Sequence, residues 1–268
     1  MTQAIVHSPI DSPRAIYCGD REIYLFSVEL VDRPGTLAEV LAVFATYGVN
    51  IANIYTTHSI YSDNRSTVEV NVAVDLTGKN VSSEQLSKSI NLLNSVKRVT
   101  VVSKQLPNIL VDELHFPLHL MGDRAVIYRE GALGEMIHAI RRQLGTAGEA
   151  LLYHVGFNIG KGAWKKIKEI CGEKMHLLPK YIQYWMLVHS AARITHIEID
   201  FEKKDFLIRA ESVYECEIGR GHGKPFSNIF RGSLAGMLSE VLGVETVVET
   251  KCIAAGDPYC EFVPGKKP

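Results

Sequence analysis

The chain has 268 residues, with 29 basic and 30 acidic side chains, 46% hydrophobic residues and 22% charged residues. These proportions belong to a globular protein and exclude a disordered chain, a collagen and a disulfide scaffold. The length predicts two domains with separate cores. A net charge of -1 gives no electrostatic reason to expect a nucleic acid or an anionic membrane as partner.

Targeting signals and cysteine usage both favour a cytoplasmic protein. No apolar run reaches the roughly 20 residues that cross a bilayer, and the N-terminal segment lacks an apolar signal region. The five cysteines are odd in number and unevenly spaced, at positions 18, 171, 216, 252 and 260. We therefore expect reduced thiols or metal ligands, and no membrane contact.

The first hundred residues alternate between strand and helix patterns. Residues 1–20 carry prolines and no apolar periodicity, which predicts a flexible leader with little core. Strands are predicted over 23–31, 49–60, 68–74 and 99–103, and helices over 36–47 and from Ser82 to about residue 95. Ser62-Asp63-Asn64 is expected to join the two middle strands as a hairpin.

The order of these elements is βαββαβ, which predicts a ferredoxin-like antiparallel sheet over 21–105 with both helices on one face. The other face and the sheet edges then need cover from a second copy or from the rest of the chain. Pro107 and Pro117 mark a connector at 106–120. The whole chain is expected to be α+β.

The second half, 121–264, predicts helices packed on a small antiparallel sheet. Helices are expected over 133–144, 147–170, from Pro179 to about 192, and 227–242, and strands over 194–201, 206–218, 246–253 and 261–263. Gly156 and Gly160 stand four apart on one helix face. This spacing favours close helix packing over the approach of a flat ligand.

Asp32-Arg33-Pro34-Gly35-Thr36-Leu37 lies between a predicted strand and helix. Pro34 presets a turn, Gly35 lets another group approach the backbone, and the free N–H groups that follow could receive a carboxylate. The pattern alone also fits an ordinary strand-to-helix turn. A second signal, Gly48-Val49-Asn50-Ile51, follows the same helix.

Together these two motifs resemble those of an ACT domain, a regulatory module of amino-acid metabolism, over residues 23–104. The resemblance implies amino-acid binding between two copies, or assembly alone. The residues that it implicates are Asp32, Pro34, Gly35, Thr36, Leu37, Asn50 and Ile51. We therefore expect a homodimer.

The C-terminal segment holds three metal-competent side chains, Glu249, Cys252 and Cys260. A hairpin at Gly256-Asp257 would fold Cys260 back beside Cys252. Because two cysteines eight residues apart do not have a zinc-finger spacing, two buried structural cysteines explain the pattern equally well.

The same segment, E-x-x-C-x-A-x-G-x-x-x-C-x-F, preceded by a glycine-bearing helix, resembles a 4-vinyl reductase type domain over 121–264. The resemblance implies structural zinc held by Glu249, Cys252, Cys260 and a cysteine before that helix, where this chain has Ser227. A hydroxyl is a poor zinc ligand. Three possibilities therefore remain open. Cys216 or His222 replaces the missing cysteine ligand, the zinc has three protein ligands and a water, or no metal binds.

A small hydrophobic ligand is the second implication of this resemblance, in an apolar cavity between helices and sheet. The candidate lining residues, each also a plausible core residue, are Phe157, Trp164, Tyr181, Tyr184, Trp185, Phe226 and Phe230.

No catalytic residues are expected, because the chain lacks the HExxH, P-loop, GxGxxG and Ser-His-Asp patterns. We interpret it as a non-catalytic regulator or sensor that acts on an unknown protein partner. The alternatives are an enzyme or accessory factor for tetrapyrrole vinyl reduction, and an assembly scaffold.

Overall fold

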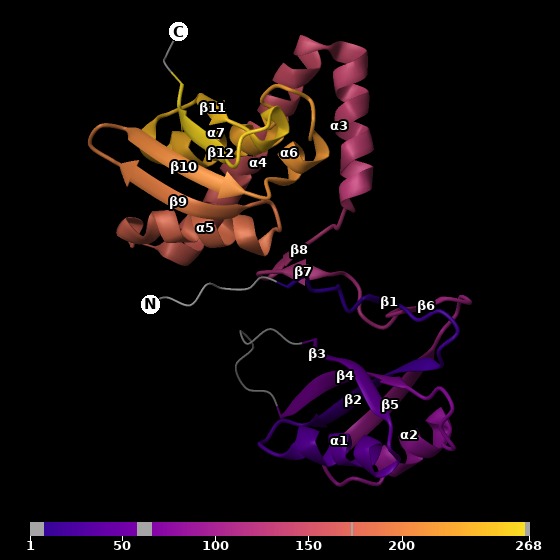
Figure 1. Ribbon diagram of the computed structural model, residues 1–268. Helices are drawn as coiled ribbons and strands as arrows, with labels where there is room; N and C mark the ends of the chain where they lie inside the picture. The colour runs from indigo at the N-terminus through magenta and orange to yellow at the C-terminus, as the bar shows by residue number, and fades with distance from the viewer. Residues whose placement is uncertain (1–7, 58–65, 173, 266–268) are drawn as a thin grey trace. The chain divides into compact units, whose positions relative to one another are not determined.

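The computed structural model describes residues 8–57, 66–172 and 174–265 (Figure 1). The chain divides into two compact units, Met1–Val126 and Ile127–Pro268. The division lies beyond the connector predicted at 106–120. None of the helices within these residues is long and apolar enough to cross a membrane.

The first unit is built on a four-stranded antiparallel sheet in the order β3-β4-β2-β5. Its elements are β2 (Ile23–Val31), α1 (Thr36–Thr46), β3 (Asn50–Thr56), β4 (Thr67–Asp75), α2 (Ser83–Asn91) and β5 (Val96–Ser103). This order confirms the predicted ferredoxin-like βαββαβ fold. The hairpin predicted at Ser62-Asp63-Asn64 lies outside the described residues.

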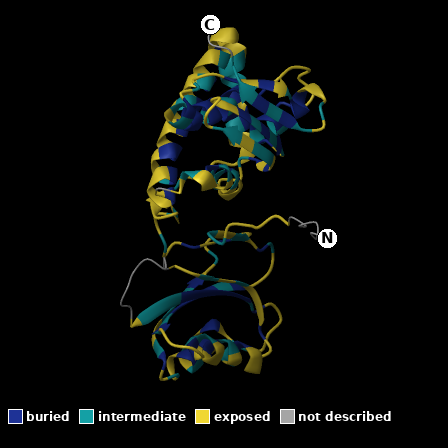
Figure 2. Cartoon of the chain, turned by 90° about the vertical axis from the view of Figure 1, so that its left-hand side faces the viewer, coloured by how far each residue is buried: buried dark blue, intermediate teal, exposed yellow. Residues whose placement is uncertain are grey.

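The helices cover one face of this sheet because alternate strand residues are apolar. Phe26, Val28 and Leu30 of β2 are buried in the same core cluster as Phe44 of α1 and Leu86 of α2. In Figure 2, much of the central part of this sheet is coloured as buried, and the helices carry both buried and exposed residues. The period-2 alternation of β2 therefore fixes which face receives the helices.

The opposite face of the sheet is covered by the chain itself. Strand β1 (Ala15–Tyr17) pairs antiparallel with β6 (Ile109–Val111). Cys18 and Leu110 pack there with Leu25, Ala73 and Val102. The expectation of a flexible leader with little core is therefore wrong for residues 15–18, because an apolar sheet face gains free energy by burial.

A short hairpin, β7 (His119–Leu120) with β8 (Asp123–Arg124), ends the first unit. The second unit then packs helices on a four-stranded antiparallel sheet in the order β11-β12-β10-β9. Its strands are β9 (Arg193–Asp200), β10 (Asp205–Glu211), β11 (Val247–Lys251) and β12 (Cys260–Pro264). Its helices are α3 (Glu130–Leu144), α4 (Thr146–Cys171), α5 (Leu178–Val188), α6 (Tyr214–Ile218) and α7 (Asn228–Leu242), with the 3₁₀ turns η1 (Met175–Leu177) and η2 (Ile253–Ala255). This arrangement confirms the predicted α+β class.

One predicted strand is wrong in its second half. The strand expected over 206–218 ends at Glu211, and the chain forms the short helix α6 from Tyr214 to Ile218. Ser212 has a positive φ of 51°, which cannot continue an extended strand. This turn brings Cys216 into the interior of the unit, where it is fully buried.

Helices α4 and α7 pack with their backbones in close contact. A Cβ on Gly156 would collide with the carbonyl oxygen of Ile229, and one on Gly160 with that of Ser233. Gly232 and Gly236 of α7 face Tyr153 and Phe157 of α4 in the same way. The four-residue glycine spacing therefore serves helix packing.

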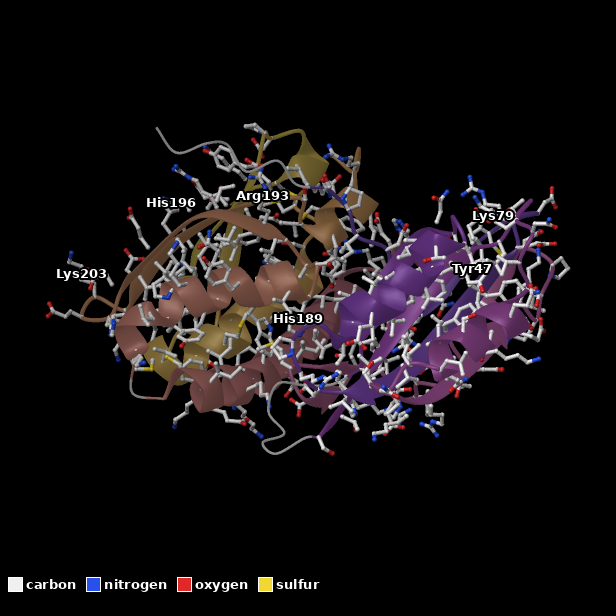
Figure 3. All side chains as sticks on the ribbon, turned by 90° about the horizontal axis from the view of Figure 1, so that it is seen from below. Tyr47, Lys79, His189, Arg193, His196 and Lys203 are labelled. Atoms are coloured by element: carbon white, nitrogen blue, oxygen red, sulfur yellow. The ribbon has the colours of Figure 1, made fainter. Side chains whose placement is uncertain are left out.

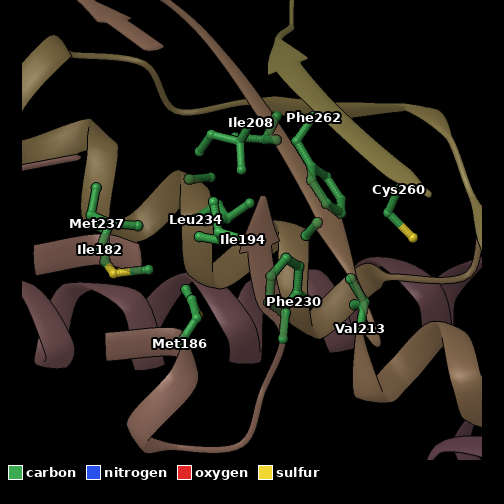
Figure 4. Close-up of a cluster of buried hydrophobic side chains, with 14 of the residues drawn as sticks. Ile182, Met186, Ile194, Ile208, Val213, Phe230, Leu234, Met237, Cys260 and Phe262 are labelled. Atoms are coloured by element: carbon green, nitrogen blue, oxygen red, sulfur yellow. The ribbon is translucent and has the colours of Figure 1, made fainter. Parts of the chain in front are cut away.

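The core of the second unit lies between these helices and the inner face of the sheet. Phe230 of α7 and Phe262 of β12 have ring centroids 5.3 Å apart, with Cys260 beside them (Figure 4). Polar side chains also lie outside this core: Arg209 of β10 pairs with Glu261 of β12 at 2.8 Å. Lys203, in the turn between β9 and β10, is directed away from the sheet (Figure 3) and pairs with Asp200.

Candidate functional site

Four side chains converge inside the second unit: Cys216, Glu249, Cys252 and Cys260. Their potential ligand atoms all lie within 4.8 Å of one another, and all four residues are buried. They come from α6, from β11 and its end, and from the first residue of β12. This is a cluster that could hold a metal ion.

The hairpin between β11 and β12 fixes the two C-terminal cysteines. Gly256 adopts a φ of 104°, which reverses the chain after η2. The carboxylate of Asp257 accepts a hydrogen bond from the backbone N–H of Cys252 at 2.8 Å. The N–H of Ile253 lies 3.5 Å from Cys260 Sγ. The Gly256-Asp257 turn thus folds Cys260 back beside Cys252, as the sequence predicted.

Ser227 contacts the cluster through the carboxylate. Its Oγ donates to Glu249 Oε2 at 2.7 Å, and its backbone N–H lies 3.3 Å from the same oxygen. The thiol of Cys216 donates to the other oxygen, Oε1, at 3.3 Å. Of the two replacements left open by the sequence, Cys216 joins the cluster, whereas His222 stacks edge-on against Phe226 with ring centroids 5.1 Å apart.

The donor set fits a zinc ion. Three sulfurs and one carboxylate oxygen are ligands that zinc takes in closed tetrahedral sites. The Sγ atoms of Cys216 and Cys252 are 3.5 Å apart, close to the roughly 3.8 Å between two thiolates of a tetrahedral site with Zn–S bonds of about 2.3 Å.

Burial changes the protonation of these groups. Burial raises the pKa of Glu249 to about 7. Hydrogen bonding with Cys252 and burial raise the pKa of Cys216, while the pKa of Cys252 is lowered by the neighbouring thiols. Burial thus opposes the charged forms of Glu249 and Cys216, whereas a bound cation would favour both.

Glu215, next to Cys216, is a buried residue that the sequence interpretation missed. Its two carboxylate oxygens accept hydrogen bonds from the backbone N–H groups of Asn228 and Phe230, each at 2.9 Å. Burial raises its pKa to about 7. Glu215 thus binds the N-terminus of α7, which holds Ser227 against Glu249. The sequence signal that could have indicated a role for Glu215 is its position directly before Cys216.

The seven aromatic residues predicted to line a ligand cavity separate into three groups. Trp164, Phe226 and Phe230 belong to the buried core, and Phe157, Tyr181 and Trp185 pack against it while partly exposed. Tyr184 is 57% exposed and points away from that core. These residues lie on α4, α5, α7 and the segment before α7.

In the first unit, the Asp32–Leu37 turn has the predicted glycine geometry. Gly35 adopts a φ of 97° at the start of α1. The buried Thr36 donates through Oγ1 to the carbonyl oxygens of Val31 and Arg33, each at 3.0 Å. Leu37 packs against the core beneath the helix. Asp32 and Pro34, in the first half of the turn, are exposed.

Asn50 and Ile51 lie at the other end of the same sheet. Asn50 pairs with Asp75, which pairs with Ile23 at the start of β2, whereas Asp32 follows the end of β2. Eight residues of strand separate these ends, or about 26 Å at roughly 3.3 Å per residue. Within one chain, the turn and the Asn50-Ile51 segment therefore do not form one site.

A family model and one curated relative match parts of this chain. Residues 24–79 match the family model of the ACT domain. An uncharacterized protein of Methanocaldococcus jannaschii, MJ0150, is 27% identical over 144 residues, which are 50% of this chain and 79% of that protein.

Two solved structures are also similar. The phenol-responsive sensory domain of the transcription activator PoxR, with phenol, has 19% identity and a TM-score of 0.48, over 54% of this chain and 78% of that one. A vinyl-4-reductase family protein from Methanocaldococcus jannaschii has 18% identity and a TM-score of 0.37, over 54% of this chain and 85% of that one. The chain therefore carries an ACT domain at residues 24–79 and is similar over about half its length to a vinyl-4-reductase family protein.

Proposed function

We propose that this protein is a ligand-binding regulator whose second unit is stabilised by a structural zinc ion held by Cys216, Glu249, Cys252 and Cys260. The observation that carries the metal assignment is the convergence of these four ligand atoms within 4.8 Å in a buried position. Four protein ligands leave no open position, which favours a structural role over a catalytic one. When bound, zinc would cross-link α6 to the β11–β12 hairpin.

Metal analysis of the purified full chain tests this assignment. We expect about one zinc ion per chain, lost in Cys252→Ser. The matched control is Cys171→Ser, because Cys171 is also buried but contacts the carbonyl oxygen of Lys174 away from the cluster. A wild-type chain that contains no zinc and takes up none from solution would contradict the proposal, as would equal metal contents in both variants.

For the ACT domain, we propose amino-acid binding between two copies of the chain. Two features support a second copy: the turn at Gly35 and the Asn50-Ile51 segment lie at opposite ends of one sheet, and β3 is an edge strand with Ile51 and Ile54 about 40% exposed. An exposed apolar edge strand is a ready pairing surface. The two halves of the site would then come from different copies.

Titration calorimetry with the twenty standard amino acids, combined with sedimentation, tests this site. We expect one amino acid to bind to a dimer, and Asn50→Ala to weaken that binding. Asn91→Ala is the control, because Asn91 is exposed on α2 and bonds only within its helix. A chain that sediments as a monomer at all concentrations, or that binds no amino acid, would contradict this part of the proposal.

We also propose a small, largely hydrophobic ligand for the second unit. The partly exposed Phe157, Tyr181 and Trp185 at the border of the core support this assignment. Trp164 and Trp185 are the two tryptophans of the chain, so their fluorescence reports on this unit. Titration with phenol as the probe should quench or shift that emission and raise the melting temperature of the unit. An unchanged emission and melting temperature would argue against this ligand class.

A further inference from the structure

A buried polar cluster lies on the face of the first sheet that the helices leave open. Here the strap, defined as residues 109–115, crosses the sheet after pairing through β6 with β1. Asp112 of the strap is 3% exposed, and Ser27 of β2 and Asn71 of β4 lie buried on the sheet. Most buried polar groups are hydrogen-bonded, as Ser27 and Asp112 are here, whereas the side-chain amide of Asn71 makes no hydrogen bond.

His115 is the centre of this cluster. Its Nδ1 lies 2.7 Å from Asp112 Oδ2, and its Nε2 lies 3.4 Å from Oε1 of Glu69 on β4. The side chain of His115 is 18% exposed, that of Asp112 1% and that of Glu69 24%. One imidazole thus stands between a carboxylate of the strap and a carboxylate of the sheet.

A neutral imidazole carries only one N–H, so it can donate to only one of these carboxylates. Its other nitrogen would then direct a lone pair at a negative charge. The imidazolium carries an N–H on each nitrogen and is attracted by both acids: Nδ1 is hydrogen-bonded to Asp112, and Nε2 faces Glu69 at ion-pair distance without a hydrogen bond. The arrangement of His115 between Asp112 and Glu69 therefore fits the protonated ring.

Three other charged or titratable groups lie around His115: Tyr55 and Glu69 reinforce this arrangement, whereas the positive charge of Arg14 opposes it. Tyr55 of β3 donates to Asp112 Oδ2 at 2.8 Å, and burial together with this bond raises the pKa of Tyr55, which keeps it a donor. Burial opposes ionisation of Glu69, but the hydrogen bond from Ser27 and the attraction of His115 outweigh it and lower the pKa of Glu69. Arg14, beside Tyr55, adds a positive charge.

We propose that His115, held between the carboxylates of Asp112 and Glu69, latches the strap onto the open face of the ACT sheet when it is protonated, and that loss of this proton loosens the strap. The strap covers Cys18 and packs through Leu110, which are 6% and 2% exposed. It also leads directly into the segment that joins the first unit to the second. The latch thus makes the attachment of the strap to the sheet depend on pH.

Alkylation of Cys18 in the full chain tests the latch. Short pulses of iodoacetamide, with the Cys18 peptide quantified by mass spectrometry, are compared between wild type and His115→Gln at pH 6, 7 and 8. The ratio of the two rates at each pH cancels the intrinsic ionisation of the thiol. We expect the wild type to react about tenfold more slowly than His115→Gln at pH 6, and nearly as fast at pH 8.

His196→Gln is the matched control, because His196 pairs with Glu198 at 3.1 Å on the surface of the second unit. It should leave the Cys18 rate unchanged. A ratio between wild type and His115→Gln that stays constant from pH 6 to pH 8 would overturn the latch.

Hydrogen exchange of the wild type alone gives a second test that needs no variant. The strap is held by backbone bonds from Asp112 N–H to the Arg14 carbonyl and from Cys18 N–H to the Asn108 carbonyl, each 2.9 Å. After correction for the intrinsic exchange rate, protection of peptides 14–18 and 109–115 should fall about tenfold between pH 6 and pH 8. Constant protection over this range would also overturn the proposal.

Discussion

The hydroxyl of Ser227 donates a hydrogen bond to Oε2 of Glu249 at 2.7 Å. The resemblance to 4-vinyl reductase type domains implied a cysteine ligand at position 227, where this chain has a serine. That hydroxyl holds one oxygen of Glu249, and the other oxygen faces Cys216. The third sulfur of the cluster comes from Cys216 of α6, and Ser227 orients the carboxylate.

Ser227→Ala should therefore weaken zinc binding about 10- to 100-fold, because partners that orient a ligand contribute at this level. Competition with a chromophoric chelator measures the affinity. The control is Ser239→Ala, which removes the same group from α7, where it bonds only to the Gly236 carbonyl oxygen. Equal zinc affinities in the two variants would show that Ser227 has no orienting role.

Gly160→Ala should destabilise the second unit by about 1–3 kcal/mol, because its Cβ would overlap the carbonyl oxygen of Ser233 and force α4 away from α7. Urea unfolding followed by tryptophan fluorescence measures the change. Gly162→Ala, on the same helix with open space around its Cβ, should instead stabilise by about 0.5–1 kcal/mol. A neutral effect at Gly160 would mean that the two helices do not pack as described.

Glu69→Gln should make the first unit less stable at pH 7 and less sensitive to acid. The pKa of Glu69 is lowered in the folded state, so its contribution is present above the pKa of the unfolded chain, about 4.3. That contribution is lost as the pH falls through the folded value. Because Glu69 is partly exposed, we expect a loss of only about 0.5–1.5 kcal/mol at pH 7.

Hydrogen exchange of the β4 amides between pH 7 and pH 3.5 measures this effect in the first unit. Glu29→Gln is the control, because Glu29 is the cross-strand neighbour of Glu69 and makes only a surface pair with Arg98 at 3.6 Å. If Glu69→Gln and wild type lose stability equally on acidification, the lowered pKa of Glu69 is not a feature of the folded protein.

Thr36→Val should cost about 1–2 kcal/mol in the first unit, because the buried Oγ1 of Thr36 donates to two backbone carbonyls of the turn before α1. Valine has nearly the same shape, so the loss isolates the hydrogen bonds. Thermal unfolding followed by circular dichroism at two wavelengths measures it. Thr46→Val, whose exposed hydroxyl bonds only to Ala42, should change stability by less than about 0.5 kcal/mol.

Local patterns were sufficient to predict the positions of most elements. The apolar run at 23–31 predicted β2, and Ser82 marked the start of α2, where the structure shows that it forms a capping box with Gln85. The failure at 206–218 arose because a run of β-favouring residues carried no signal for the positive φ of Ser212. Residues 15–18 were missed because three-residue pairing with a segment some ninety positions away leaves no periodicity.

The sequence by itself determined the two folding units, the ACT motif, and three of the four side chains of the cluster, because these features depend on near neighbours in the chain. Only the tertiary structure decided that Cys216, and not His222, completes the cluster, that Ser227 orients Glu249, and that His115 meets Glu69. These contacts join residues separated by 22 to 46 positions, whose distance depends on how strands and helices pack together rather than on their spacing in the chain.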